Sequence, residues 1–313
     1  MRQRAPILLI WLLITGLPGW ADDAVPEPIN NNWLDHSHDT LQLHTQKAAI
    51  WVDHFFGDCC DEEEPATILT RITLGWETSQ HGVSNSYARV RAKIKLPNLK
   101  ERFYLVLSNE EVDEYKLLPL EAKRPQEAVE DTEDNYNIAL RWIKRSTIKE
   151  KTEARIGLRS GSNIYLLGRH RRYHSLTRTI KLRLTPAIFI DSEYGAGTRL
   201  LTELDHLFNH PGLIRFSARG QFDNRSEGIE WSSGLSYTYL LSNEGAVVGG
   251  FYLRGESDGD DDVENYSTSI RLRKQFWRAY LFYEIEPFID WPASDNYRTN
   301  KGIALSIQIV IGE

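Results

Sequence analysis

The sequence predicts an all-β fold: an antiparallel transmembrane β-barrel of about 12–14 strands behind a short N-terminal periplasmic segment. From Thr67 to the end of the chain, apolar and polar residues alternate with a period of two, as in strands whose two faces meet different surroundings. The alternating segments 264–276 and 279–291 are about thirteen residues long, whereas strands of soluble proteins hold about five or six.

Aromatic residues near the ends of the predicted strands are the third observation, because Trp and Tyr gather at both interfaces of a membrane. They are Trp76, Tyr87, Tyr173, Tyr194, Tyr239, Tyr266, Trp277 and Trp291.

Residues 1–21 have the order of a secretory signal peptide. Arg2 and Arg4 precede an apolar run over 7–17, and the segment ends in the small residue Ala21. The run is shorter than the ~20 residues of a membrane-spanning helix. The whole chain has a net charge of −7, and losing these two Arg and no acid leaves −9. We therefore expect no nucleic-acid partner, since such partners select basic surfaces.

Residues 22–66 are predicted to form a periplasmic arm. Positions 22–46 are polar and include two Pro and three consecutive Asn. Apolar side chains recur over 47–57 (KAAIWVDHFFG), which predicts a short amphipathic helix or a plug-like segment before the acidic run 61–64.

The sequence has no pattern typical of a metal-binding site or of a reactive cysteine. Cys59 and Cys60 are its two cysteines, and they are adjacent in an acidic stretch that disfavours the thiolate. A lone Cys-Cys pair is a poor ligand set, and His36, His38 and His44 in the arm are loosely spaced. We expect no metal site and no cofactor.

The barrel is predicted to span residues 67–313. Alternation is clearest over 67–77, 88–96, 180–185, 214–219, 229–239, 266–273, 281–290 and 303–311. Weaker candidates lie near 102–109, 136–146, 153–160, 163–173, 193–204 and 246–256. Counting all of them gives about fourteen strands, and merging the doubtful ones gives about twelve.

The links between these segments alternate in length. Short links include 97–100, 242–245 and 275–278, and longer polar links include 110–135, 222–227, 257–264 and 292–301. Membrane barrels have short periplasmic turns and longer outer loops. We therefore expect the long links outside and both ends of the barrel in the periplasm, although 205–212 is long for an inner turn.

The polar face of the alternation would line the lumen. Its basic residues would be Arg89, Arg91, Lys93, Lys95, Arg141, Arg155, Arg159, Lys181, Arg183, Arg215, Arg219, Arg271 and Arg273, and its acidic residues Glu77, Glu230, Glu284 and Glu286. One interpretation is a passive pore that selects small anionic solutes. The other is a structural envelope protein whose filled lumen pairs Arg with Glu across strands.

Two alternatives compete with a passive barrel. His81, Ser84 and Asn85 supply the residue types of an outer-membrane lipid hydrolase with a site at the rim. However, residues three apart on a strand face opposite sides, so we expect no catalytic residue and no enzyme. The second alternative is a soluble periplasmic β-protein with a binding role, since alternation does not say whether the apolar face meets lipid or a core.

A basic run over 169–174 (RHRRYH) falls near the periplasmic side in this topology. It would contact anionic phospholipid headgroups or only prevent strand slippage.

The signal peptide, the alternating C-terminal strands and the segment 280–287 (YLFYEIEP) resemble uncharacterised Gram-negative outer-membrane β-barrel proteins. The resemblance covers 67–313 as a pattern and transfers no catalytic residue. It implies the outer membrane as location, with outer-membrane lipid, lipopolysaccharide and the barrel-assembly machinery as partners. Many such proteins end in an aromatic residue, and the ending Ile311-Gly312-Glu313 departs from that pattern.

The barrel predicts heat-modifiable electrophoretic mobility. A folded barrel resists detergent until it is boiled, so the protein in isolated outer membranes should change its apparent mass on heating. A soluble periplasmic protein without this change would contradict the fold class.

Overall fold

The computed structural model describes residues 68–82, 84–95, 103–108, 136–147, 149–159, 163–192, 195–208, 212–225, 228–242, 244–258 and 262–312. None of these residues forms a helix long and apolar enough to cross a membrane. The predicted signal peptide, the arm, the two cysteines and the three arm histidines lie outside the described residues.

Fourteen strands and a 3-10 turn, Ala293–Asp295, occupy the described ranges. The strands are β1 (Ile68–Ser79), β2 (Asn85–Lys95), β3 (Phe103–Ser108), β4 (Asn137–Ser146), β5 (Glu150–Arg159), β6 (Asn163–Ser175), β7 (Ile180–Asp191), β8 (Gly195–Leu207), β9 (Gly212–Asp223), β10 (Glu230–Ser242), β11 (Gly245–Glu256), β12 (Asn265–Phe276), β13 (Arg278–Pro292) and β14 (Asn300–Gly312).

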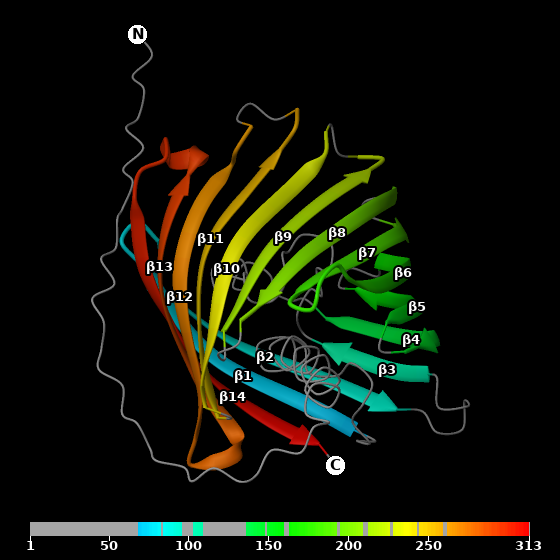
Figure 1. Ribbon diagram of the computed structural model, residues 1–313, viewed down its shortest axis with the longest axis horizontal. Coiled ribbons are helices and arrows are strands. Elements are labelled where there is room, and N and C mark those ends of the chain that lie inside the picture. The colour runs from blue at the N-terminus through cyan, green and yellow to red at the C-terminus, as the bar shows by residue number, and fades with distance from the viewer. Residues whose placement is uncertain are drawn as a thin grey trace, which may run out of the picture. The chain divides into compact units, whose positions relative to one another are not determined.

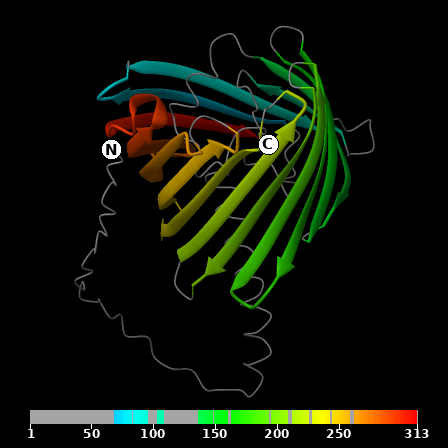
Figure 2. The same cartoon turned by 90° about the horizontal axis from the view of Figure 1, so that it is seen from above.

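Each strand pairs antiparallel with its neighbours in the chain, and β1 also pairs with β14, so the sheet is a closed barrel (Figures 1 and 2). The contact that closes it runs from Leu69 opposite Gly312 to Ser79 opposite Gly302. Because the strand number is even, the first and last residues of the barrel lie at one rim. We call this the periplasmic rim and the opposite one the outer rim, because the longest links, 109–136 and 257–264, lie at the opposite rim and long loops of such barrels face outward.

The fold class predicted from the sequence is confirmed, and each weaker candidate segment forms a strand of its own. The predicted alternation of link lengths holds only in part. The outer links 160–162 and 192–194 are as short as periplasmic turns, so the expectation of uniformly long outer links is wrong there. At the periplasmic rim, Trp277 alone joins β12 to β13, with a φ of 57°.

The two faces of the wall have opposite character. On β7, Ile188 and Ile190 point outward and are 68% and 61% exposed, whereas Arg183 and Asp191 point inward and are buried. A soluble β-barrel would place the apolar face inside, where burial stabilises it. The alternative of a soluble periplasmic β-protein is therefore wrong, and the architecture is that of a transmembrane β-barrel.

Exposed aromatic side chains occur towards both rims. Trp76 and Tyr297 lie near the outer rim, and Tyr239, Trp277 and Tyr280 near the periplasmic rim.

Two members of the predicted aromatic girdle are placed differently. Tyr87 is buried on the inner face and Tyr173 lies inward beside Arg183. Both share the period-two position of inward Arg residues on their strands, and this position outweighs proximity to a strand end. Tyr194 lies outside the described residues.

Two prolines interrupt the hydrogen-bonded ladder in mid-strand. The pairing of β6 with β7 breaks beside Pro186, and the pairing of β12 with β13 breaks beside Pro287. The ladders on the other sides of these prolines, β7 with β8 and β13 with β14, are continuous. Since proline has no N–H to donate, each break falls on the side where that N–H would have pointed.

Four glycines on the inner face each lie directly opposite an aromatic residue of the neighbouring strand. The pairs are Gly75 with Tyr87, Gly157 with Tyr165, Gly197 with Phe189, and Gly302 with Phe288. A Cβ added to any of these glycines would come within 2.1–2.6 Å of the opposing ring. The rings therefore lie flat across the glycines, in contacts that leave no room for a larger side chain.

Replacing Gly157 by Ala should destabilise the folded barrel by about 1–3 kcal/mol, because overpacking forces the Tyr165 ring to move. The measurement is the urea midpoint of refolding into detergent or lipid, read from the heat-modifiable band. Gly168→Ala is the matched control, since a Cβ there would meet only Ile188 at 3.5 Å. Equal midpoints for the two variants would contradict the role of the ring contact.

Candidate functional site

The inner face of the barrel wall is the candidate site, and the structure places all seventeen residues predicted from the sequence on it. Buried among them are Glu77, Arg141, Arg155, Arg159, Arg183, Arg215, Arg219, Arg271, Arg273 and Glu286. The others, Arg89, Arg91, Lys93, Lys95, Lys181, Glu230 and Glu284, are partly exposed.

The structure adds inward charges that the sequence interpretation did not name. The basic ones are Arg71, Lys151, Arg169, Arg171, Arg199 and Arg254, and the acidic ones are Glu153, Asp191, Glu203, Asp205, Asp223, Glu256 and Asp290. Six of these thirteen lie at even spacing from a predicted residue on the same strand, as Glu153 does from Arg155, and the other seven lie on β6, β8 and β11, from which the sequence interpretation named no residue. Extending the period-two pattern to the strand ends would have found the first six, and applying it to the weaker strand candidates would have found the others.

The inward charges are divided unequally around the wall. In the described part of β1–β7, thirteen basic residues face inward together with three acids, Glu77, Glu153 and Asp191. In the described part of β8–β14, six basic residues and eight acidic residues point inward. One half of the inner wall is therefore strongly cationic and the other is slightly acidic.

Glu153 is the centre of a cationic cluster on β4–β6. Its side chain is 1% exposed, and its carboxylate accepts hydrogen bonds from Arg141 and Arg169 at 2.5 Å and from Arg155 at 3.1 Å. Lys151 Nζ lies 3.7 Å from the same carboxylate. A buried carboxylate is stable only with such partners, and the cations in this group outnumber it four to one.

A second cluster alternates charge across β7, β8 and β9. The guanidinium of Arg183 donates to both oxygens of Glu203. Arg215 binds Asp205 with two hydrogen bonds, of 2.6 and 2.9 Å, and lies 3.8 Å from Glu203. Bidentate arginine–carboxylate pairs fix both side chains in orientation as well as in place.

Further ion pairs link β5 to β7 and β12 to β13. Arg159 lies 3.1 Å from Asp191, and Arg271 donates to Glu286 at 2.8 Å. Arg159 also has an aromatic neighbour, because its guanidinium lies 4.6 Å from the centre of the Tyr165 ring. Arginine over an aromatic face gains a cation–π interaction.

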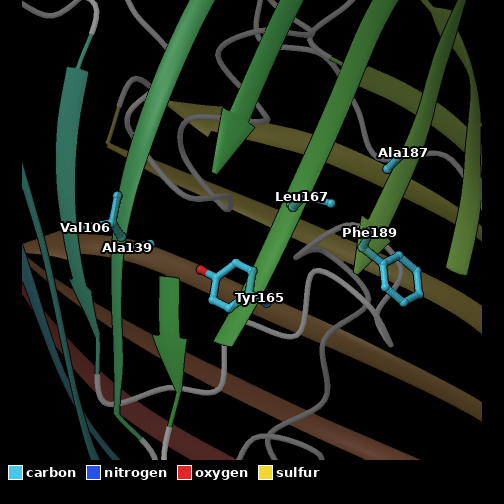
Figure 3. Close-up of a cluster of buried hydrophobic side chains, with 6 residues drawn as sticks. All are labelled: Val106, Ala139, Tyr165, Leu167, Ala187 and Phe189. Atoms are coloured by element: carbon cyan, nitrogen blue, oxygen red, sulfur yellow. The ribbon is translucent and has the colours of Figure 1, made fainter. Parts of the chain in front are cut away.

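An apolar patch interrupts the charges on the cationic half of the inner wall. It consists of Val106, Ala139, Tyr165, Leu167, Ala187 and Phe189, each 5% exposed or less (Figure 3). Its Tyr165 hydroxyl donates to Asn137 Oδ1 at 3.1 Å. The inner wall thus combines arginines with apolar and aromatic side chains.

The residues proposed for a rim hydrolase do not form a catalytic pair in the described part of the outer rim. Ser84 Oγ accepts a hydrogen bond from the Trp76 indole N–H at 2.7 Å. The backbone N–H of His81 donates to Asn300 Oδ1 at 3.1 Å. A nucleophilic serine needs a base within hydrogen-bonding distance of its hydroxyl, and the contact that Ser84 makes is to an indole.

Metal-binding geometry is likewise missing from the described residues, where no three His, Cys, Asp or Glu side chains are grouped to hold an ion.

No family model and no curated protein matches the sequence. Solved structures resemble the fold. OccK11 of Pseudomonas aeruginosa has a TM-score of 0.44 at 8% identity, with 79% of this chain and 96% of that chain covered. The outer membrane channel DcaP of Acinetobacter baumannii has a TM-score of 0.47 at 6% identity, with 79% and 97% covered. OmpT, an outer membrane protein of Vibrio cholerae, has a TM-score of 0.47 at 7% identity, with 80% and 99% covered. At these identities no residue role transfers to this chain.

Proposed function

We propose that this chain is a β-barrel of the Gram-negative outer membrane that passes small anionic solutes by diffusion, without a catalytic step. The observation that carries the proposal is the unequal division of inward charge, thirteen basic residues against three acids on β1–β7. Rings of basic residues raise the local concentration of anions in a pore and exclude cations.

The location in the membrane follows from the outer face and from closure. Exposed apolar side chains cover the outside of the wall, as Leu166, Ile188 and Ile270 do at 50–68% exposure. In hydrocarbon, every backbone N–H and C=O needs a partner within the protein, which a closed barrel provides. An outward apolar face and an inward charged face suit lipid outside and polar surroundings inside.

A structural envelope protein with a filled lumen is the second candidate, and the depth of burial on the inner face favours it. Glu203 is 0% exposed and Arg215 is 1% exposed, although both point into the barrel. Side chains that lined a wide aqueous channel would keep more contact with water.

The proposal includes no enzymatic role. The surroundings of Ser84 support this, because the recorded partner of its Oγ is the Trp76 indole N–H, which donates a hydrogen bond and cannot take the hydroxyl proton as a base would.

Single-channel recording of the full chain in planar bilayers under a salt gradient tests the pore. The cationic half-wall predicts a reversal potential that favours the anion. A folded, heat-modifiable barrel without conductance would support the structural role, and a preference for cations would sink the anion-pore proposal.

The double substitution Lys93→Gln and Lys95→Gln should lower the anion-to-cation permeability ratio roughly twofold, because both partly exposed side chains lie on the cationic half of the inner face. Lys274→Gln is the control, since Lys274 is an exposed residue of β12 that points outward. The same shift in both variants would show that net charge alone, and not charge in the lumen, sets the selectivity.

Ser84→Ala should leave any phospholipid or lipid A hydrolysis by the purified barrel at the level of the unchanged protein. The assay follows fatty-acid release from vesicles or from lipid A. Activity that is present in the unchanged protein and lost in this variant would overturn the non-enzymatic proposal.

A further inference from the structure

The basic run over 169–174 is divided between the two faces of β6. Arg169, Arg171 and Tyr173 point inward, and Arg169 binds Glu153. His170, Arg172 and His174 point outward, on the face that elsewhere carries apolar side chains. A strand with this sequence therefore presents three basic or ionisable groups to the surroundings of the barrel.

These outward groups lie on the periplasmic half of the strand. Ile164 and Leu166, nearer the outer rim, are 57% and 50% exposed and apolar. The outward face then changes at Gly168 to His170, Arg172 and, near the rim, His174. At ~3.3 Å per residue, Arg172 lies roughly 20 Å along the strand from Leu166. The change from apolar to basic is the one expected where acyl chains give way to headgroups.

Neighbouring elements add positive charge at the same rim. Lys144 of β4, Lys149 of the β4–β5 turn and Arg178 of the β6–β7 turn are all exposed. The Lys149 carbonyl accepts a hydrogen bond from the Tyr173 N–H at 2.8 Å, which holds this turn against β6. We call the set Lys144, Lys149, His170, Arg172, His174 and Arg178 the basic rim patch.

The contacts within the basic rim patch leave it positively charged. Glu150 lies 3.6 Å from Arg172, and these side chains are 21% and 55% exposed. Thr152 Oγ1 lies 2.8 Å from His170 Nδ1. The basic rim patch thus holds four Lys and Arg side chains, of which Arg172 has the recorded contact with a described carboxylate.

The periplasmic rim is not basic all round. On β9 and β10 the outward residues near this rim are Ile214, Tyr237, Tyr239 and Leu241, and each is 36–53% exposed. The basic rim patch therefore does not extend over β9 and β10, and two further exposed basic residues of this rim, Lys274 and Arg278, lie apart from it at the β12–β13 turn.

We propose that the basic rim patch binds the headgroup of an anionic phospholipid in the periplasmic leaflet. Leu182 and Leu184 of β7 lie opposite His174 and Arg172 on the outward face, so apolar side chains adjoin the basic ones. A phospholipid has an acyl chain next to a phosphate, so it can contact the leucines and the basic residues together. A soluble inorganic anion has no apolar part that would contact the leucines. Lys and Arg near an anionic membrane surface contribute about 1 kcal/mol each, which is roughly fivefold in affinity. The proposal depends on the outer-membrane location and not on conduction.

Lipid binding to the folded full chain in detergent tests this proposal, with native mass spectrometry counting bound phosphatidylglycerol against bound phosphatidylcholine. The unchanged protein should prefer phosphatidylglycerol. The triple variant Lys149→Gln, Arg172→Gln and Arg178→Gln should bind it at least tenfold more weakly, with binding of phosphatidylcholine unchanged.

The control removes three exposed positive charges outside the patch, two at the β12–β13 turn of the same rim and one near the outer rim, by Lys274→Gln, Arg278→Gln and Lys301→Gln, and should keep the preference. The charge-conserving variant Lys149→Arg, Arg172→Lys and Arg178→Lys should also keep it. Heat-modifiable mobility identifies the folded fraction of each variant before measurement, so a folding failure is not read as lost binding.

Three results would overturn the proposal: no preference in the unchanged protein, equal loss in the triple variant and the control, or displacement of the lipid by millimolar inorganic phosphate. The last would assign the patch to a soluble anion. This measurement does not depend on channel activity. The lipid-binding proposal can therefore be supported even if the barrel does not conduct ions.

Discussion

Closure of the backbone hydrogen-bond ladder between β1 and β14 is the constraint on which the rest of this structure depends. A bilayer core offers no water to an unpaired N–H or C=O, so an open sheet edge would be prohibitively costly there. Once the sheet is closed, each strand has one face towards lipid and one towards the interior. The two prolines are compatible with this because each interrupts the ladder on one side only.

The same constraint explains why so much charge is buried. Residues excluded from the lipid face have to point inward, where buried charges are stable only when they are paired. Glu153 among its cations and the alternation of Arg183, Glu203 and Arg215 are the results. In the described part of β1–β7 the inward basic residues still outnumber the inward acids, so this side of the interior is more positive than the side formed by β8–β14.

Much of the fold could be predicted from the sequence because the period-two pattern of a strand is local. It can be recognised from residues close in sequence, such as Arg271 and Arg273. The acid that each arginine meets could not be predicted. Glu203 reaches Arg183 through the register between β7 and β8, which a single strand does not encode. Tyr87 is the opposite case: the preference of aromatic residues for interfaces predicts an outward side chain, but its position in the period-two pattern turns it inward. The outward half of 169–174 became a site only when turn residues from elsewhere, such as Lys149, were placed beside it.

The glycine–aromatic contacts have a consequence for assembly. All four opposed pairs lie within hairpins that turn at the outer rim, β1–β2, β5–β6, β7–β8 and β13–β14, so each joins residues close in sequence. Slipping one strand by a single residue would turn its inward charges towards lipid and would set the ring against a side chain instead of a glycine. In each of these hairpins the glycine–aromatic contact therefore favours the correct register before the barrel closes. Pairing errors are disfavoured within the hairpin, ahead of the slow long-range step that joins the first strand to the last.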